Sequence, residues 1–533
     1  MASGLRAILL LAGLWRPLEA APSLPDEGRC AEGGAREPWV AAGPQETTDC
    51  GKEEMLAAPQ ETRDRGEEEP VAMLQALGSS WRDLSEGQLE EQAAAHLARF
   101  ASAVRGGDGA GGRAAGEPHA SCKITAEESC NISSLAEQEW TVIHPAGEGS
   151  PYQEGVNMQC IDGSPFSFSF WRGSRDRLLI FFQGGGACWN SWSTHGIGST
   201  GPLCTTSAKH NNLNMNYGPL NMMNDSNPFR NHSVLSVTYC SGDAFAGDVV
   251  QPYGIQSDPW SPRAVQKGYR HMLAALDWVQ SNEEFDGTSP LEDLTVQGCS
   301  AGTLAIQIWA NALLGRFAYE HARVALDSWA GVFPHHTQSI MLQNWGTCDL
   351  PILAPAQQAE CRNPSGLFAV NLTVAAMANH KSARFVTINS KTDAVQRYFY
   401  TLTKFPSVES AILKTLRHGL HVFESLDAAT YYHRLNKQVL EIYRAHENWQ
   451  GFLVDGASHC FCFDKWLDFG SYSFGYFWSG PLGAADDTGS PRVAQNLVDL
   501  EAADPPPFIC EGEGLDPADA ADDNQTYCDI NLL

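Results

Sequence analysis

Ser300 lies in the G-C-S-A-G sequence of residues 298–302, a G-x-S-x-G pattern whose central serine could act as a nucleophile. The pattern follows the strand-length apolar run 294–296 and precedes a nearly continuous apolar stretch at 303–314. A serine on such a strand-to-helix turn exposes its hydroxyl at the edge of a sheet, and the flanking glycines avoid collisions there. The N-terminus of the following helix stabilises developing negative charge. The sequence therefore predicts that Ser300 is the nucleophile of an acyl-transfer reaction.

A serine nucleophile needs a general base, and the base needs a carboxylate that orients it. In this fold class the three groups follow in the order Ser, Asp, His. His459 comes directly after the last strand-length apolar run, at 452–454, and is therefore the predicted base. Asp393 and Asp327 each follow an earlier run of this kind. Asp393 is the preferred acid, and Asp327 is the alternative acid or else a buried structural carboxylate.

Three consecutive glycines at 184–186 directly follow the apolar run 178–182. Serine esterases build half of their oxyanion hole at this place, because glycine lets backbone N–H groups approach the substrate oxygen. The second N–H is expected from Ala301, directly after the nucleophile. A phosphate-binding loop is the competing interpretation, but no G-K-[ST] sequence follows the glycines.

A metal site is the competing interpretation for His459, Cys460 and Cys462, which lie close together in the sequence. In an oxidising compartment, the two cysteines are expected to form disulfides instead. No second His/Cys pair has the spacing of metal ligands. We therefore predict neither a metal nor a cofactor.

The elements that must position these residues follow a regular pattern of short apolar runs and helical stretches. The runs are strand-length and rich in β-branched or aromatic residues, at 178–182, 234–238, 294–296, 324–326, 385–388 and 452–454. Helices are expected between them, including 262–281, 301–314 and 431–446. Such alternation predicts an α/β fold, in which a mainly parallel central sheet is flanked by helices, within one catalytic domain at 138–482.

The segments outside this domain have different compositions. Residues 1–21 have a basic start, a short apolar core and small residues at the end, which predicts a cleaved signal peptide and secretion. Residues 22–137 have the composition of a low-complexity, weakly ordered arm that could include an amphipathic helix at 73–104. Residues 483–533 are predicted to form an acidic tail. No apolar segment reaches the roughly 18 residues that span a bilayer, so we expect no stable membrane insertion.

The composition narrows the range of partners. The 533 residues include 63 acidic and 35 basic side chains, a formal net charge of −28. Nucleic-acid and anionic-membrane binding both require basic surfaces, so neither is expected. The 15 cysteines behind a signal peptide predict disulfides, with Cys188–Cys204 and Cys348–Cys361 as plausible short loops. The odd count leaves at least one cysteine free or paired with another molecule, and Cys299 is the predicted free thiol. The oligomeric state is left open.

Several ordered stretches together resemble the pectin acetylesterase/Notum family of serine carboxylesterases. The matching stretches contain the glycines, the serine and the candidate acids and base, and they lie at 160–165, 184–189, 239–243, 298–302, 327–328, 392–396 and 458–460. The resemblance implies an α/β-hydrolase-like fold and the cleavage of carboxylic esters. It also implies Ser300 as nucleophile, Asp393 as acid and His459 as base.

The same resemblance implies that Gly185 and Ala301 donate N–H groups to the oxyanion, while Gly184 and Gly186 shape the loop. The implied reaction is removal of O-acetyl groups from an acylated polysaccharide through an acyl-serine intermediate. An acylated protein is the alternative substrate, as for a Notum-like deacylase of a lipid-modified protein. A serine peptidase would use the same triad. A catalytically silent relative would instead bind carbohydrate by stacking sugar rings on Trp189 and Trp192.

Overall fold

The structure is a computed structural model that describes residues 120–195, 202–208, 218–225, 227–252, 263–334, 337–362, 368–404, 426–454, 459–462 and 508–510. The predicted signal peptide, the helix expected at 73–104, most of the predicted arm and most of the acidic tail lie outside these residues. Within the described residues, no helix has both the length and the apolar character needed to cross a membrane.

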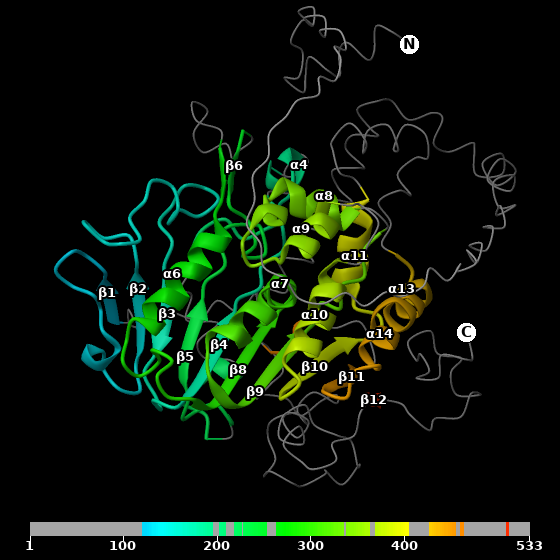
Figure 1. Ribbon diagram of the computed structural model, residues 1–533. Coiled ribbons are helices and arrows are strands. Elements are labelled where there is room, and N and C mark those ends of the chain that lie inside the picture. The colour runs from blue at the N-terminus through cyan, green and yellow to red at the C-terminus, as the bar shows by residue number, and fades with distance from the viewer. Residues whose placement is uncertain are drawn as a thin grey trace, which may run out of the picture. The chain divides into compact units, whose positions relative to one another are not determined.

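A mixed sheet organises the described part of the chain (Figure 1). Its strands follow the order β1-β2-β3-β5-β4-β8-β9-β10-β11-β12. The strands are β1 (Ala120–Lys123), β2 (Trp140–His144), β3 (Phe168–Trp171), β4 (Arg177–Phe182), β5 (Ser233–Val237), β8 (Leu291–Cys299), β9 (Tyr319–Asp327), β10 (Ala383–Ser390), β11 (Trp449–Val454) and β12 (Phe508–Cys510). A separate antiparallel pair joins β6 (Val249–Gln251) to β7 (Ala264–Gln266).

The six predicted strands are confirmed as the central run β5-β4-β8-β9-β10-β11 of this sheet. Every neighbouring pair in that run is parallel. The predicted fold class, a mainly parallel sheet flanked by helices, is therefore confirmed. Strand β3 is antiparallel to β2 and to β5, and this edge of the sheet was not predicted.

Helices complete the α/β architecture. They are α4 (Ser191–His195), α6 (Gly268–Gln280), α7 (Ala301–Arg316), α8 (Thr337–Asn344), α9 (Pro355–Arg362), α10 (Phe368–Asn379), α11 (Ala394–Thr403), α13 (Ala428–Arg434) and α14 (Glu441–Tyr443). The expected helix at 431–446 is instead divided, because a π-helical segment, Leu435–Leu440, separates α13 from α14. Short 3-10 turns lie at Ile132–Ser134, Gly218–Leu220 and Thr347–Asp349.

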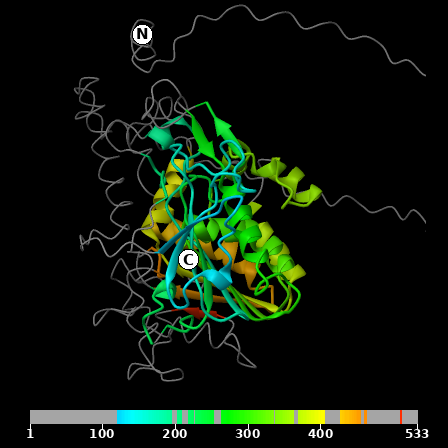
Figure 2. The ribbon, with the colours of Figure 1, turned by 90° about the vertical axis from the view of Figure 1, so that its left-hand side faces the viewer.

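The central strands are apolar on both faces because each face is covered. In β4, Leu178, Ile180 and Phe182 belong to the main core, which also contains the buried residues of α6, α7 and α10. The alternate residues Leu179 and Phe181 belong to a second apolar cluster on the other face. Figure 1 shows α6, α7 and α10 on the near side of the sheet, and Figure 2 views it from the β1 edge. A continuous apolar run is thus the expected pattern for a doubly covered strand.

The sheet extends beyond the residues predicted for the catalytic domain. Strand β1 lies within the predicted arm at 22–137, where Cys122–Cys130 also forms a disulfide. Strand β12 lies within the predicted acidic tail at 483–533 and pairs in parallel with β11. The predicted domain boundaries themselves stay predictions.

Five disulfides occur within the described residues. Two are the predicted short loops, Cys188–Cys204 and Cys348–Cys361, and both are confirmed. The others are Cys122–Cys130, Cys160–Cys240 and Cys299–Cys460. The prediction of Cys299 as the unpaired thiol is therefore wrong.

Candidate active site

Ser300 occupies the turn between β8 and α7. Its backbone is in a left-handed conformation, with φ 57° and ψ −120°, which a residue with a side chain adopts only at a cost of about 1–3 kcal/mol. A Cβ on Gly298 or Gly302 would lie 2.8 Å or 2.2 Å from the carbonyl oxygen of Phe182. Both flanking glycines are therefore required by the close packing of this turn against the end of β4.

The loop after β4 passes directly beside this turn. A Cβ on Gly184 would lie 2.6 Å from the carbonyl oxygen of Cys299 and 3.2 Å from the Cβ of Ser300. Only a glycine allows this approach. Ala301 follows Ser300 directly and is the first residue of α7, where the N–H groups have no acceptor within the helix. The glycine loop and the first turn of α7 therefore both adjoin Ser300.

The next two glycines fix the course of the loop. Gly185 and Gly186 have φ values of +152° and +68°, which side chains disfavour. A Cβ on Gly185 would lie 2.4 Å from Thr205 Oγ1, and one on Gly186 would lie 2.1 Å from the carbonyl oxygen of Leu203. The hydroxyl of Tyr239 donates a hydrogen bond to the carbonyl oxygen of Gly186 at 3.0 Å. These contacts with Thr205, Leu203 and Tyr239 thus fix the backbone conformation of the glycine loop.

Asp393 and His459 form a hydrogen-bonded pair, with 2.8 Å between Asp393 Oδ2 and His459 Nδ1. Asp393 is fully buried after β10, at the N-terminus of α11. Its carboxylate also accepts hydrogen bonds from the backbone N–H and the side-chain amide of Gln396, each at 2.9 Å. A carboxylate oxygen accepts, so Nδ1 of His459 donates in this pair, and Nε2 of a neutral ring in this tautomer is an acceptor.

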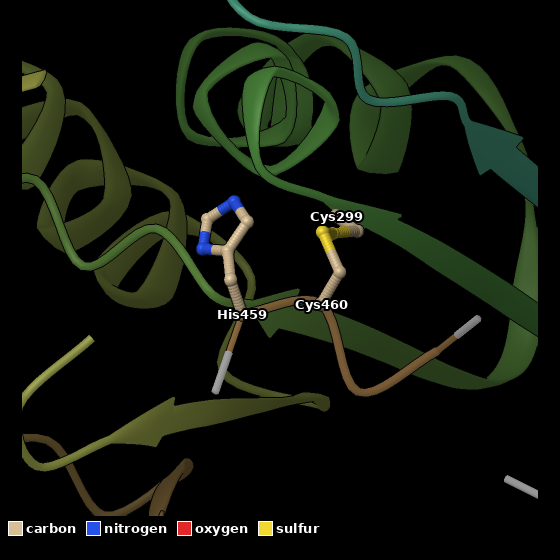
Figure 3. A group of neighbouring side chains, drawn as sticks. All are labelled: Cys299, His459 and Cys460. Atoms are coloured by element: carbon tan, nitrogen blue, oxygen red, sulfur yellow. A yellow bond between two sulfur atoms is a disulfide. The ribbon is translucent and has the colours of Figure 1, made fainter. Parts of the chain in front are cut away.

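His459 Nε2 is buried and has no hydrogen-bond partner among the described residues, so Ser300 does not bind it in this structure. Such contacts are often long before a substrate is bound. A disulfide nevertheless joins Cys299 to Cys460, with their Cα atoms 5.5 Å apart. These cysteines are the immediate neighbours of Ser300 and His459, and Figure 3 shows the imidazole beside the disulfide. The serine and the histidine are thus brought to one edge of the sheet.

Asp327, the alternative acid, binds a different part of the His459 loop. Its Oδ1 accepts a hydrogen bond from the N–H of Phe461 at 3.1 Å, and its Oδ2 accepts one from the N–H of Cys462 at 2.8 Å. Burial raises the pKa of Asp327, although hydrogen bonds from Ser328, Phe461 and Cys462 act in the opposite direction. The structure therefore brings His459 to Asp393 and gives Asp327 a separate set of partners.

The cysteines near His459 do not form a metal centre in this state. A ring nitrogen of His459 and the sulfurs of Cys299 and Cys460 lie within 4.8 Å of one another. However, the two sulfurs are joined in a disulfide, whereas metal binding requires thiolates. Cys460 was expected in a disulfide and is found in one, whereas none of the five disulfides within the described residues contains Cys462. The partner of Cys299 lies 161 residues away, too far for sequence spacing to suggest.

Two features of the site were missed or misplaced by sequence reasoning. Ser328 and Gln396 both contact site residues, and only their inclusion in the family-like stretches could have indicated them. Trp189 was considered as a platform for sugar rings, but its side chain is completely buried and packs near Phe399, with ring centroids 6.4 Å apart. The side chain of Trp192 lies outside the described residues.

Part of the chain matches a family model. Residues 150–362 match the model of the Pectinacetylesterase family, which confirms the resemblance and supports a carboxylic-ester hydrolase. This range contains the glycine loop and Ser300, whereas Asp393 and His459 lie beyond it. A solved structure of the Wnt deacylase Notum from Drosophila is similar at 14% identity, with a TM-score of 0.36, over 59% of this chain and 86% of that one. No curated protein sequence matches the chain.

Proposed function

We propose that this chain, which matches the pectinacetylesterase family over residues 150–362, hydrolyses carboxylic esters with Ser300 as nucleophile, His459 as base and Asp393 as acid. The observation that carries the proposal is the 2.8 Å hydrogen bond between Asp393 and His459 Nδ1, which leaves Nε2 buried without a described partner. An imidazole held in this tautomer can accept a proton only at Nε2.

In the proposed reaction, Ser300 Oγ attacks the ester carbonyl while its proton passes to His459 Nε2. Asp393 stabilises the imidazolium that forms, without itself accepting the proton. The tetrahedral intermediate then collapses, and the leaving alcohol takes the proton from His459. Water, deprotonated by the same imidazole, hydrolyses the acyl-serine and restores the hydroxyl.

The backbone N–H groups of Gly185 and Ala301 are the proposed donors to the oxyanion, and Gly184 and Gly186 keep the loop beside Ser300. The close approach of Gly184 to Ser300 supports this assignment. One such donor typically stabilises the transition state by about 3 kcal/mol. Backbone donors also need no reorganisation during the reaction, because the glycine loop is held by its neighbours.

The proposed substrate is an O-acetyl group on a polysaccharide, because the matched family is that of the pectinacetylesterases. The proposed location is extracellular, which the five disulfides in the described residues support. A deacylase of a lipid-modified protein is the second candidate, since the same triad would serve a longer acyl chain. The burial of Trp189 speaks against a silent protein that stacks sugars on this ring.

Hydrolysis of p-nitrophenyl esters from acetate to octanoate tests the proposal. Ser300→Ala should reduce kcat at least about 10³-fold, whereas Ser133→Ala, at an exposed serine, should leave it unchanged. A fluorophosphonate probe should label the wild type and the Ser133→Ala variant but not the Ser300→Ala variant.

The acyl-chain profile separates the two substrate classes. Highest activity on acetate supports an acetylesterase, and highest activity on octanoate supports a lipid deacylase. If the folded wild-type protein cleaves none of these esters and is not labelled by the probe, the esterase proposal fails and a binding function becomes the better hypothesis.

A further inference from the structure

The end of β9 lies between the strands that carry the nucleophile and the acid. In the sheet, Asp327 is paired with Cys299 of β8 and with Ile388 of β10. Its backbone carbonyl accepts hydrogen bonds from the N–H of Ser300 at 3.1 Å and from the hydroxyl of Thr303 at 2.6 Å. The main chain of Asp327 is therefore bound directly to the nucleophile turn.

The side chains at the same point bind the loop that follows His459. Ser328 Oγ accepts a hydrogen bond from the N–H of Cys460 at 2.8 Å and donates one to Asp327 Oδ1 at 2.6 Å. Asp327 accepts the next two N–H groups, from Phe461 and Cys462. Two adjacent residues thus bind three consecutive backbone N–H groups immediately after the proposed base.

Left-handed backbone conformations gather at the same place. Ser300, Ser328 and Cys460 have φ values of 57°, 57° and 62°. Residues with side chains keep such conformations only where the surroundings impose them, often at active sites. Here the surroundings are the hydrogen bonds of the Asp327–Ser328 pair and the disulfide of Cys460. The strained turn of the serine and that of the histidine loop are therefore fixed by the same short segment.

We propose that Asp327 and Ser328 are positioning residues that hold His459 in place relative to Ser300. This inference rests on the proposed esterase function. The backbone of Asp327 fixes the nucleophile turn, and the side chains of the pair fix the loop of the base. Proton transfer depends strongly on geometry, and a displacement of about 1 Å can reduce the rate about 10²-fold.

Asp327→Asn is the most informative variant, because it keeps the shape of the side chain. The amide has one acceptor oxygen and presents a donor NH2 group to backbone N–H groups, so at least one bond to Phe461 or Cys462 is lost. We expect kcat to fall about 10-fold to 100-fold while KM changes less than about twofold. Ser328→Ala removes the bonds to Cys460 and to Asp327 but leaves the Asp327 carboxylate and its bonds to Phe461 and Cys462, so it should lower kcat by a smaller factor.

Asp293→Asn is the matched control. Asp293 is also a buried carboxylate, but it lies near the amino end of the neighbouring strand β8, where it binds Arg323 and His232. This variant should keep the wild-type kcat. If Asp327→Asn folds and keeps kcat within twofold of wild type, or if Asp293→Asn loses as much activity, the positioning role is wrong.

Amide hydrogen exchange of a peptide spanning residues 459–462 gives a readout that does not depend on activity. Exchange should become faster in Asp327→Asn and Ser328→Ala and stay unchanged in Asp293→Asn. Unchanged exchange in the first two variants overturns the inference. If exchange responds as expected while the wild type cleaves no ester, the esterase proposal fails and the assignment of Asp327 and Ser328 to this loop is retained.

Discussion

Two buried carboxylates, Asp293 beside the middle of strand β9 and Asp327 at its end, are held in opposite ways. At the middle of β9, Arg323 pairs with Asp293 of the adjacent strand at 2.5 Å, and His232 binds the same carboxylate at 3.1 Å. At its end, Asp327 accepts hydrogen bonds from the hydroxyl of Ser328 and from backbone N–H groups. In the first arrangement, the positive charge of Arg323 neutralises the carboxylate of Asp293. In the second, the carboxylate of Asp327 holds the loop that follows His459 through hydrogen bonds.

The pKa values differ accordingly. Burial raises the pKa of Asp293, but the hydrogen bond from His232 and the positive charge of Arg323 outweigh it and lower the pKa to about 2. For Asp327, burial prevails and the pKa is raised. The comparison indicates that buried charges near the amino ends of the strands stabilise the fold, whereas those at the carboxyl ends serve the candidate active site. Ligand sites at the carboxyl ends are usual for open parallel sheets. Three variants test this division.

The largest effect is expected from Asp393→Asn, at the carboxyl end of β10. The amide would place a donor against His459 Nδ1 and favour the wrong tautomer, so kcat should fall about 10⁴-fold. KM should change little, because the substrate is not expected to contact this buried side chain. Ester kinetics over a range of substrate concentrations measure both constants. A decrease of less than about tenfold would mean that another carboxylate orients the imidazole.

Asp293→Asn should instead reduce stability. Removing one partner of a buried ion pair leaves Arg323 uncompensated, at a cost of about 3 kcal/mol in the free energy of unfolding. Asp349→Asn is the surface control, because its pair with Arg362 is exposed and should contribute less than about 1 kcal/mol. Urea unfolding measures both. An equal loss of unfolding free energy in Asp293→Asn and Asp349→Asn would show that burial does not make the Asp293–Arg323 pair more stabilising than the exposed Asp349–Arg362 pair.

The pH dependence of the unfolding free energy should also show that the buried carboxylate of Asp293 stabilises the fold. Because the pKa of Asp293 is lowered to about 2 in the folded protein, its ionisation stabilises the fold above pH 4 and this contribution is lost as the pH falls toward 2. A shift of this size corresponds to about 2 kcal/mol. The difference in unfolding free energy between the wild type and Asp293→Asn should therefore narrow over this range. A constant difference from pH 6 to pH 3 would contradict the lowered pKa.

Local sequence patterns predicted much of the central fold. The six parallel strands follow from short apolar runs, because a strand covered on both faces needs apolar residues at every position. The position of Ser300 between a strand and a helix also follows from local sequence, since the close packing at Gly298 and Gly302 excludes side chains. The strands β1 to β3 were not predicted, because they join the sheet through successive pairings that begin with β3 on β5, and no local pattern indicates these pairings.

The sequence alone thus determined the strand-turn-helix unit of Ser300, the glycine loop and the presence of suitable carboxylates after neighbouring strands. Only the tertiary structure decided which carboxylate meets His459. Asp327 and Asp393 both follow strand-length apolar runs and are equally buried, and the difference arises from where the loop at 459–462 packs. The pairing of Cys299 with Cys460 was decided in the same way. The periodicity of apolar residues in the sequence indicates which residues are buried. Contacts between segments that are distant in the sequence depend instead on the order of the strands in the sheet, which determines which strand ends are neighbours.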